Sequence, residues 1–399
     1  MANVYERIGV RTIINAKGPS TRLSGGPMRA EVAEAMVEGS QHCVEMAELQ
    51  ARASEIIAEV TGAEAGLVTS GAAAGLLLGA AACVTGLDSG RMNRLPDTAG
   101  MANEVVVVRS QRNFYDHMIR AVGVRLVEVG LPDRYAGAGA RDAEAWEIAD
   151  ALSERTAAVL WVAAPNARPR LEQVVEVAHA AGMPVLVDAA AQLPPVHNLR
   201  RFLDAGADLV AFSGGKAIGG PQASGILCGR RYLIMAAALQ HLDLDVFYEL
   251  WAPPMHFIDK TRLKGLPQHG IGRGCKVGKE EIVGLLTALR LFVEEDEVAR
   301  HARWRALMQE LADGLADLPH ARISLVDDGE VPLLALDLEP AAGVGALELM
   351  KRLEQGTPAV FADPAAVDQG RILLGPMSLK DGEPTRIAER LRGLLGRGA

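Results

Sequence analysis

Apolar residues along this chain alternate between short continuous runs and longer patterns with helical spacing. The short runs, which we expect to be strands, lie at 104–108, 157–164, 184–188 and 208–213, and a further strand with alternating apolar residues is expected at 124–129. Helical spacing of apolar residues occurs between them, at 115–122 and 171–181. Continuous apolar strands that alternate with helices are typical of a parallel sheet covered by helices on both faces. The pattern therefore predicts an α/β fold for this part of the chain.

The first hundred residues predict helices around one short strand. Residues 29–60 carry a long helical pattern of apolar positions. A strand is expected at 65–69, followed by a turn at Gly71 and a helix rich in Ala and Leu. The apolar run 66–84 comes closest to the length of a membrane span, but its many Gly and Ala residues favour a buried helix.

After about residue 250 the pattern changes to that of a smaller α+β domain. Helices are expected at 280–296, 302–318, 344–354 and 384–395, and strands at 322–326, 331–337 and 371–374. The Gly- and Pro-rich stretch 252–278 is the expected seam between the domains. We therefore expect an N-terminal segment at 1–40, a large domain at 41–255 and a small C-terminal domain at 256–399.

Charge and composition exclude several classes of protein. Asp and Glu number 50 against 41 Lys and Arg, and an acidic chain without long basic runs is a poor candidate for general nucleic-acid binding. We see no signal peptide and no apolar run long enough to span a membrane. The four cysteines form no CxxC pair, which argues against a zinc or disulfide framework. We expect a cytoplasmic protein without a metal site and without nucleic-acid or membrane partners.

Three features follow predicted parallel strands, at the sheet edge where open α/β folds bind their ligands. The first is Thr69-Ser70-Gly71-Ala72, where a glycine turn opens a helix whose free N–H groups could hold an anion. An ordinary helix cap is an equally good interpretation of these residues alone. The second feature is Asp188, which closes an apolar strand at a cost unless a partner compensates its charge. It either caps the next helix or faces a cationic ring nitrogen or a metal.

The third feature is Lys216, which is flanked by glycines at 214, 215, 219 and 220. A phosphate-binding loop would require Gly at position 210 and Ser or Thr after the lysine, whereas this chain has Val210 and Ala217. A lone lysine is normally a solvated surface charge. Glycines on both sides of it nevertheless suit an imine-forming lysine, because they allow a cofactor ring to approach the backbone.

Together the three features fit pyridoxal phosphate. This cofactor needs a lysine for a Schiff base, an acid that keeps its ring nitrogen protonated, and a cradle for its phosphate. Asp188 precedes Lys216 by 28 residues, which is close to one strand–helix–strand step. The joint pattern is far more specific than any of its parts.

Beyond these residues, the chain resembles the pyridoxal-phosphate enzymes of the aspartate-aminotransferase fold. Within them it is similar to the branch that contains bacterial selenocysteine synthase and D-glucosaminate-6-phosphate ammonia-lyase. The motifs that carry this resemblance lie at 4–16, 64–74, 111–117, 272–281 and 379–383. The resemblance covers nearly the whole chain, makes 41–255 the cofactor-binding domain, and implies a homodimer or a higher homo-oligomer.

The resemblance also implies which residues bind the cofactor. Lys216 would form the Schiff base, and Asp188 would pair with the pyridine nitrogen. Either Tyr115 or His117 would cover the outer face of the ring, and their spacing does not choose between them; for either one alone, a helix start packed on the sheet is the plain alternative. The residues implied to hold the phosphate are Ser70, Gly71, Ala72 and Ser213.

Substrate binding is the least determined part of the resemblance. Relatives tend to read Asn-Ala-Ala-Gly where this chain has Lys17 as the third residue, and Asn-Pro where it has Gly375-Pro376. Both places usually border the substrate, so these departures leave the substrate open. A solvated loop charge is the alternative interpretation of Arg273. The residues that we expect to bind the substrate are Lys17, Thr21, Arg22 and Arg273.

The expected activity is a lyase reaction on a small hydroxy-amino acid. Abstraction of the α-proton followed by β-elimination would give a 2-oxo acid and ammonia. An aldolase, a racemase or an aminotransferase on the same scaffold is the alternative. A selenocysteine-synthase-like transferase acting on aminoacyl-tRNA is less favoured, because the chain is acidic and the resemblance starts at residue 4. The presence of both Lys216 and Asp188 disfavours a non-catalytic scaffold protein.

Overall fold

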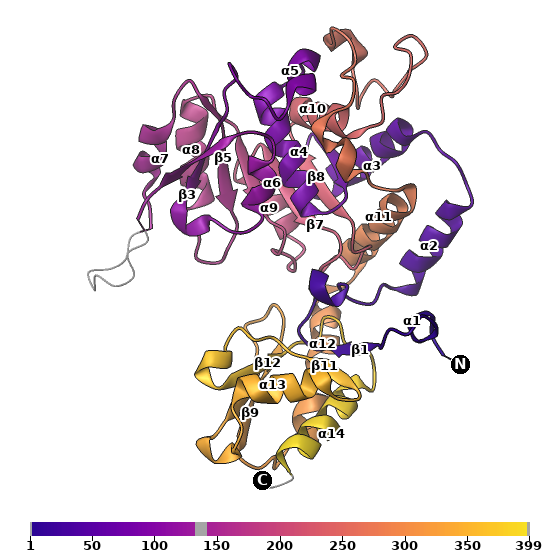
Figure 1. Cartoon of the computed structure of the whole chain (residues 1–399), viewed down its shortest axis with the longest axis vertical. Coiled ribbons are helices and arrows are strands. Elements are labelled where there is room, and N and C mark those ends of the chain that lie inside the picture. Colours follow the sequence, from indigo (N-terminus) through magenta and orange to yellow (C-terminus); the bar gives the residue numbers. More distant parts are fainter. Residues whose placement is uncertain (1, 132–141, 397–399) are drawn as a thin grey trace. The chain divides into compact units, whose positions relative to one another are not determined.

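The computed structural model describes residues 2–131 and 142–396 and divides into two compact units (Figure 1). The large unit is Met28–Val293. The small unit joins Met1–Pro27 to Glu294–Ala399, so that it contains both ends of the chain.

The large unit is built on a seven-stranded sheet with the order β2-β8-β7-β6-β5-β3-β4. Strand β8 is antiparallel to both of its neighbours, and the other pairs are parallel. This mostly parallel sheet confirms the α/β fold expected from the sequence. The strands are β2 (Ala65–Thr69), β3 (Glu104–Val108), β4 (Arg125–Val129), β5 (Thr156–Val162), β6 (Val185–Asp188), β7 (Leu209–Ser213) and β8 (Gly225–Gly229).

Helices bury both faces of this sheet, which explains why its strands are apolar throughout rather than alternating. In β3, Val105 and Val107 pack into the core on one face, while Val106 and Val108 pack into the core on the other. The first face is covered mainly by α4 (Ala72–Thr85) and α10 (Arg231–His241). The second is covered by α3 (Met46–Thr61), α7 (Ala145–Ala151), α8 (Leu171–Ala180), α9 (Asn198–Asp204) and α11 (Lys279–Glu294).

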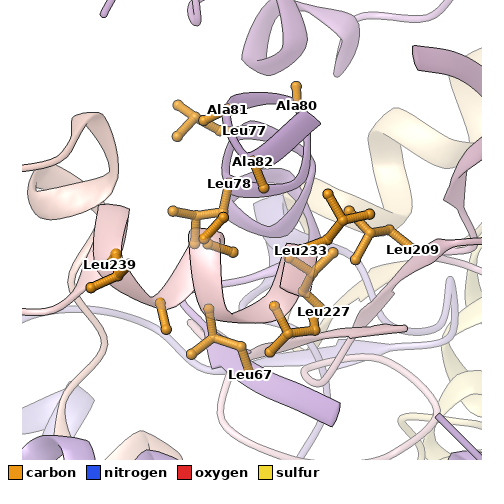
Figure 2. Packing of buried hydrophobic residues seen from close by; sticks show 14 of the residues in the cluster. Leu67, Leu77, Leu78, Ala80, Ala81, Ala82, Leu209, Leu227, Leu233 and Leu239 are labelled. Carbon is orange, nitrogen blue, oxygen red and sulfur yellow. The ribbon is translucent and has the colours of Figure 1, made fainter. Parts of the chain in front are cut away.

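Helix α4 is buried on almost every side. Its Leu77 and Leu78 lie in one cluster with Leu233 and Leu239 of α10 and with sheet leucines such as Leu227 (Figure 2). Burial on all sides accounts for the Ala- and Leu-rich sequence, which has no polar stripe. The helix therefore forms the rigid support behind the turn that precedes it.

The long helical pattern at 29–60 is two helices rather than one. Helix α2 (Ala30–Ser40) ends before a short break, and α3 starts after Glu45, whose carboxylate accepts the Glu48 N–H at 2.8 Å. Such a cap starts a new helix because it satisfies an N–H group that has no partner within the helix. The remaining short helices of the large unit are α5 (Ser89–Arg94), α6 (Asp116–Arg120) and the 3₁₀ turns η2 (Arg109–Gln111), η3 (Lys260–Arg262) and η4 (Ile271–Cys275).

The small unit is an α+β structure, as expected. Its antiparallel sheet has the order β12-β10-β9, and a second, parallel pair joins β1 to β11. The strands are β1 (Ile13–Asn15), β9 (Ala321–Val326), β10 (Leu333–Leu338), β11 (Ala359–Phe361) and β12 (Arg371–Leu374). The helices are α1 (Val4–Arg7), α12 (Glu297–Gly314), α13 (Ala346–Gln355) and α14 (Glu383–Leu395), with 3₁₀ turns η1 (Thr21–Leu23), η5 (Pro340–Ala342) and η6 (Val367–Gln369).

The compact units are Met28–Val293 and Met1–Pro27 with Glu294–Ala399, and the expected domain boundaries at residues 40 and 255 stay a prediction. Helix α11 belongs to the large unit, because Ile282, Leu285 and Leu289 are buried in the core of its second face. The first 27 residues belong to the small unit, because β1 pairs with β11. Apolar periodicity identifies helices but does not say which sheet they cover.

Within residues 2–131 and 142–396, no helix is long and apolar enough to cross a membrane. The same part of the chain contains no group of three or more His, Cys, Asp or Glu side chains placed to hold a metal ion. The four cysteines are free thiols.

Replacing Leu78 by alanine tests whether α4 is the support of the large unit. We expect Leu78→Ala to lower the free energy of unfolding by about 2–5 kcal/mol, because it leaves a cavity in a closely packed core. Leu347→Ala is the matched control, since this leucine on α13 is 57% exposed. Chemical denaturation measures both variants. Equal, small losses in the two would contradict the assignment.

Candidate active site

The candidate site lies where β2, β6 and β7 end at the same edge of the large sheet. Strand β8 is antiparallel to both β2 and β7, so these two run in the same direction and finish together. Strand β6 is parallel to β7 and ends at Asp188, while Ser213 ends β7. Lys216 lies in the turn after β7. The structure thus brings Asp188, Ser213, Lys216 and the β2–α4 turn to one edge.

Asp188 is a buried carboxylate with 8% of its surface exposed. Burial raises the pKa of the Asp188 carboxyl above its usual range. Three smaller effects lower it: the Ala190 N–H, the charge of Lys216 and the side chain of Asn113. The Ala190 N–H donates to Oδ1 at 3.1 Å. This carboxylate would gain from a cation placed beside it, because such a charge offsets the cost of burial.

Lys216 is half-buried, and burial lowers the pKa of its ammonium group, with the charge of Asp188 acting in the opposite direction. The charges of Asp188 and Lys216 therefore interact. A lysine with a lowered pKa has more of the neutral amine, which is the nucleophilic form.

The turn between β2 and α4 is held close to β8. Gly71 has a φ of 110°, a conformation that favours glycine, and it precedes the first residue of α4. Gly225 of β8 pairs with both Thr69 and Ser213, and a Cβ on it would lie 2.4 Å from the carbonyl carbon of Gly71. The close approach brings the N–H groups at the start of α4 beside Ser213, in an arrangement suited to an anion.

Ser70 and His241 tie this turn to η4. The Ser70 hydroxyl donates to the Cys275 carbonyl at 2.7 Å, and His241 Nε2 lies 3.0 Å from the same oxygen. Burial lowers the pKa of His241, so the ring is neutral and Nε2 carries the proton that this contact requires. Sequence patterns did not single out His241 or Gly225, because both act through contacts far along the chain.

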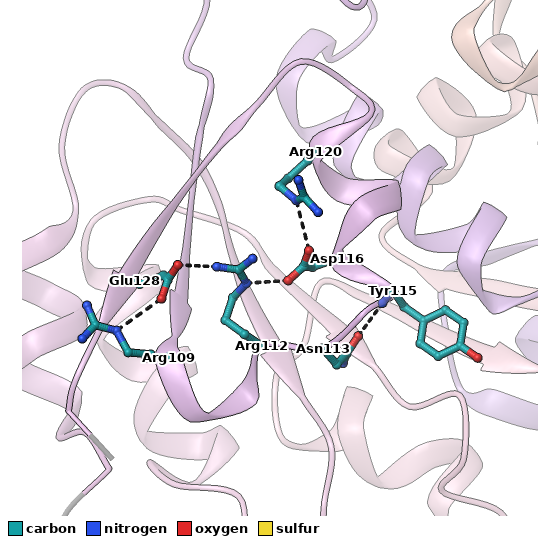
Figure 3. A network of polar contacts seen from close by, with 7 residues as sticks. All are labelled: Arg109, Arg112, Asn113, Tyr115, Asp116, Arg120 and Glu128. Atoms are coloured by element: carbon teal, nitrogen blue, oxygen red, sulfur yellow. Dashed lines mark hydrogen bonds and ion pairs between the residues drawn. The ribbon is translucent and has the colours of Figure 1, made fainter. Parts of the chain in front are cut away.

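The loop after β3 is fixed by a network of ion pairs (Figure 3). Arg112 lies between Glu128 and Asp116 and pairs with both. Arg120 pairs with Asp116 at 3.1 Å. Although burial raises the pKa of Asp116, hydrogen bonds from these two arginines leave it below its usual value. The network holds the loop 109–120 in one conformation.

Asn113 is the residue of this loop that contacts Asp188. Its Oδ1 accepts the Tyr115 N–H at 2.8 Å, and the Asn113 side chain lowers the pKa of Asp188, against the larger effect of burial. Asn113 lies in the motif 111–117 but is not among the residues predicted from the sequence. Tyr115 is 58% exposed and His117 is also exposed, and the described contacts do not choose between them as the group that covers a ring.

The residues expected to bind substrate fall into both units. Arg273 lies on η4 in the large unit, and its Nε donates to Asp243 at 3.1 Å. Lys17, Thr21 and Arg22 lie in the small unit. The Lys17 N–H donates to Asn15 Oδ1 at 3.1 Å, and the Arg22 guanidinium lies 5.2 Å from the centre of the Phe361 ring.

The groups at this edge fit pyridoxal phosphate. Asp188 can pair with a ring nitrogen, Lys216 can form the covalent link, and the start of α4 can receive the phosphate. Gly225 makes room for that cradle, since any side chain there would collide with the turn.

Comparison with known proteins supports this interpretation. The family described as SelA, L-seryl-tRNA selenium transferase, matches residues 28–245. The chain is 32% identical to 5'-C-glycyluridine monooxygenase-decarboxylase from Streptomyces sp, over 98% of this chain and 92% of that protein. It is 30% identical to D-glucosaminate-6-phosphate ammonia lyase from Salmonella typhimurium (strain 14028s / SGSC 2262), over 98% and 97% of the two chains.

Solved structures show the same relationship. The structure of D-glucosaminate-6-phosphate ammonia-lyase matches with a TM-score of 0.82 at 29% identity and covers 99% of each chain. Aspartate aminotransferase from Thermus thermophilus with maleate matches with a TM-score of 0.50 at 18% identity, over 98% of this chain and 93% of the other, which is a likeness of fold. The expected aspartate-aminotransferase-like fold is confirmed, and the resemblance on which it rested is confirmed as well. This chain is an enzyme that belongs to the SelA family, whose members and fold depend on pyridoxal phosphate.

Proposed function

We propose that this enzyme is a pyridoxal-phosphate-dependent lyase that converts a small hydroxy-amino acid into a 2-oxo acid and ammonia. The observation that carries the proposal is the presence of Asp188 and Lys216 at the ends of adjacent parallel strands, each shifted in pKa by burial. The similarity to an ammonia lyase over nearly the whole chain supports the reaction class.

In this proposal, Lys216 holds the cofactor covalently and Asp188 pairs with its ring nitrogen. Ser213 and the N–H groups of Gly71 and Ala72 hold its phosphate. Ser70 supports the cradle, and its hydroxyl hydrogen is directed to Cys275. Tyr115 or His117 covers the outer face of the ring. When bound, the cofactor withdraws electrons from the α-carbon of the substrate.

Lys216 is also the proposed carrier of the α-proton. The substrate's amino group would displace Lys216 from its covalent link, and the released amine, whose pKa burial lowers, would accept a proton from the α-carbon and pass it to the departing β-hydroxyl. Glycines on both sides of the lysine allow its backbone to lie close to the reacting atoms. The β-hydroxyl then leaves as water, and hydrolysis of the unsaturated amine consumes one water and yields the 2-oxo acid and ammonia.

Four cationic or polar residues are proposed to bind the substrate's anionic groups. A guanidinium recognises a carboxylate through paired hydrogen bonds, which suits Arg273 and Arg22. The ties from Ser70 and His241 to Cys275 hold the segment that carries Arg273 beside the cradle. Lys17 and Thr21 are the other two residues proposed to bind substrate.

A different reaction on the same scaffold is the second candidate, because a relative of similar identity is named a monooxygenase-decarboxylase. The products distinguish the two. Release of ammonia and a 2-oxo acid without oxygen uptake supports the lyase. Oxygen consumption with release of carbon dioxide would favour the second reaction, and a requirement for a 2-oxo acid acceptor would favour an aminotransferase.

The lyase is tested by a screen of D- and L-hydroxy-amino acids, including sugar-derived acids, with the cofactor-loaded protein. We expect Lys216→Ala to lower 2-oxo acid formation by about 10²–10⁴-fold, because it removes the proton carrier. Lys351→Ala is the control, since this lysine is exposed on α13. Cofactor retention after dialysis is a second readout. A Lys216→Ala protein with unchanged turnover and cofactor retention would refute the assignment.

The contact between Asn113 and Asp188 predicts a shift in pH dependence. The hydrogen bond favours the ionised carboxylate, so its loss raises the pKa of Asp188 and leaves more of it protonated at a given pH. In Asn113→Ala, the acidic limb of the kcat/KM profile should move to higher pH, because the group that favours the ionised carboxylate is lost. Asn113→Asp should move it further, because it adds a negative charge. Unmoved limbs in both variants would contradict this role.

We further propose that the enzyme is a cytoplasmic homodimer or higher homo-oligomer. Large apolar side chains of the large unit are exposed in the single chain, with Phe247 and Leu250 at 76% each. Such exposure is characteristic of surfaces that another protein covers.

Light scattering during size-exclusion chromatography tests the oligomeric state. We expect a mass of at least two chains for the wild type and a larger monomer fraction for Phe247→Ser/Leu250→Ser. Leu347→Ser, an exposed leucine of the small unit, is the control. A monomeric wild type at micromolar concentration would refute the proposal.

A further inference from the structure

A cavity of about 260 Å³ lies in the large unit and includes neither Asp188 nor Lys216. It is formed by the loop between β5 and α8, the first turn of α8, and one side of α9. Its lining includes the side chains of Trp161, Arg168, Arg170, Glu172, Arg201 and Phe202.

Three arginines from two segments line this cavity, and all three are exposed to solvent. Arg168 and Arg170 come from the loop before α8, and Arg201 comes from α9. Glu172 is the single acidic residue in the lining. Among the residues that the structure describes, none of the three arginines forms an ion pair, whereas Arg112, Arg120 and Arg230 elsewhere in the unit each do.

The three arginines of the lining outnumber its one carboxylate, that of Glu172. Like charges placed side by side destabilise a fold, and a chain with a net charge of -9 has carboxylates available to pair with them. Arg201 lies over the Phe202 ring at 5.8 Å, and none of the three guanidiniums forms an ion pair among the described residues. Guanidiniums that line one cavity without carboxylate partners suit a multiply charged anion.

The floor and the loop of the cavity are fixed. Trp161 and Phe202 are buried beneath it, and the Trp161 Nε1–H donates to the Pro169 carbonyl at 3.0 Å. The Arg168 carbonyl accepts a hydrogen bond from Gln111 Nε2 at 3.1 Å, and the Arg170 N–H donates to Gln173 Oε1 at 3.1 Å. The backbone that carries Arg168 and Arg170 is therefore held in place before any ligand arrives.

We propose that this cavity binds a small dianion through a phosphate group, at a site separate from the cofactor cradle. Arginine forks match phosphate oxygens in pairs, so two or three guanidiniums satisfy one phosphate group. The volume admits inorganic phosphate or a small phosphate ester and is at the lower limit for larger ligands. The site is independent of the reaction proposed above.

Calorimetric titration of the cofactor-loaded protein with inorganic phosphate, at constant ionic strength, tests the site. We expect Arg168→Ala/Arg201→Ala to weaken binding by about tenfold or more, since two charge-assisted contacts are lost. Arg52→Ala/Arg94→Ala is the control with the same change in net charge, because both arginines are exposed and already paired, with Glu55 and Asp97. The two phosphate sites separate in this design, since the cofactor's own phosphate would occupy the cradle of the loaded protein and leave only the cavity for added phosphate.

Three outcomes would overturn the proposal: no binding to the wild type, equal weakening in the two double variants, or tighter binding of succinate than of phosphate. Arg170→Gln provides a second test if the double variant does not fold, and it too should weaken phosphate binding. Loss of lyase activity has no bearing on these titrations, so failure of the proposed reaction and failure of this site are distinguishable.

Discussion

The burial of two opposite charges at one edge of a parallel sheet is the constraint on which the site depends. A carboxylate and an ammonium lose hydration when they leave water, and the fold tolerates this only where each has partners in a fixed place. Asp188 is held by the end of β6, the Ala190 N–H and Asn113, and Lys216 by the turn after β7. The buried helix α4 and the ion-pair network around Arg112 keep the surrounding turns where these two groups need them.

The parts of the fold that are buried on both faces could be predicted from the sequence. Strands β3, β5, β6 and β7 are continuous apolar runs, and only a strand covered on two sides needs that pattern. Asp188 and Lys216 could be selected in the same way. Burying a charged residue near the end of such a run lowers the stability of the fold unless a partner compensates its charge. The β2–α4 turn could be selected from its position at the end of a predicted strand, whereas Ser213 was implied by the family resemblance.

Features that depend on partners far along the chain could not be predicted in this way. Strand β1 has three residues and is a strand because β11 pairs with it, and β8 begins and ends with glycine. Asn113 stands in a loop beside Tyr115 and His117, and only its contact with Asp188 distinguishes it. The cavity lined by arginines could not be predicted for the same reason, since α9 brings Arg201 to a loop more than thirty residues earlier in the sequence.

The pairing of β1 with β11 has a consequence for the order in which the protein is made. The large unit is an insertion between the two pieces of the small unit, and a ribosome completes it before β11 exists. Ile14 and Ala16 end in the core of the small unit, among side chains that are synthesised last. The first 27 residues of the nascent chain therefore lack their final partners until the large unit has been synthesised. The small unit can complete its fold only after the large unit has left the ribosome.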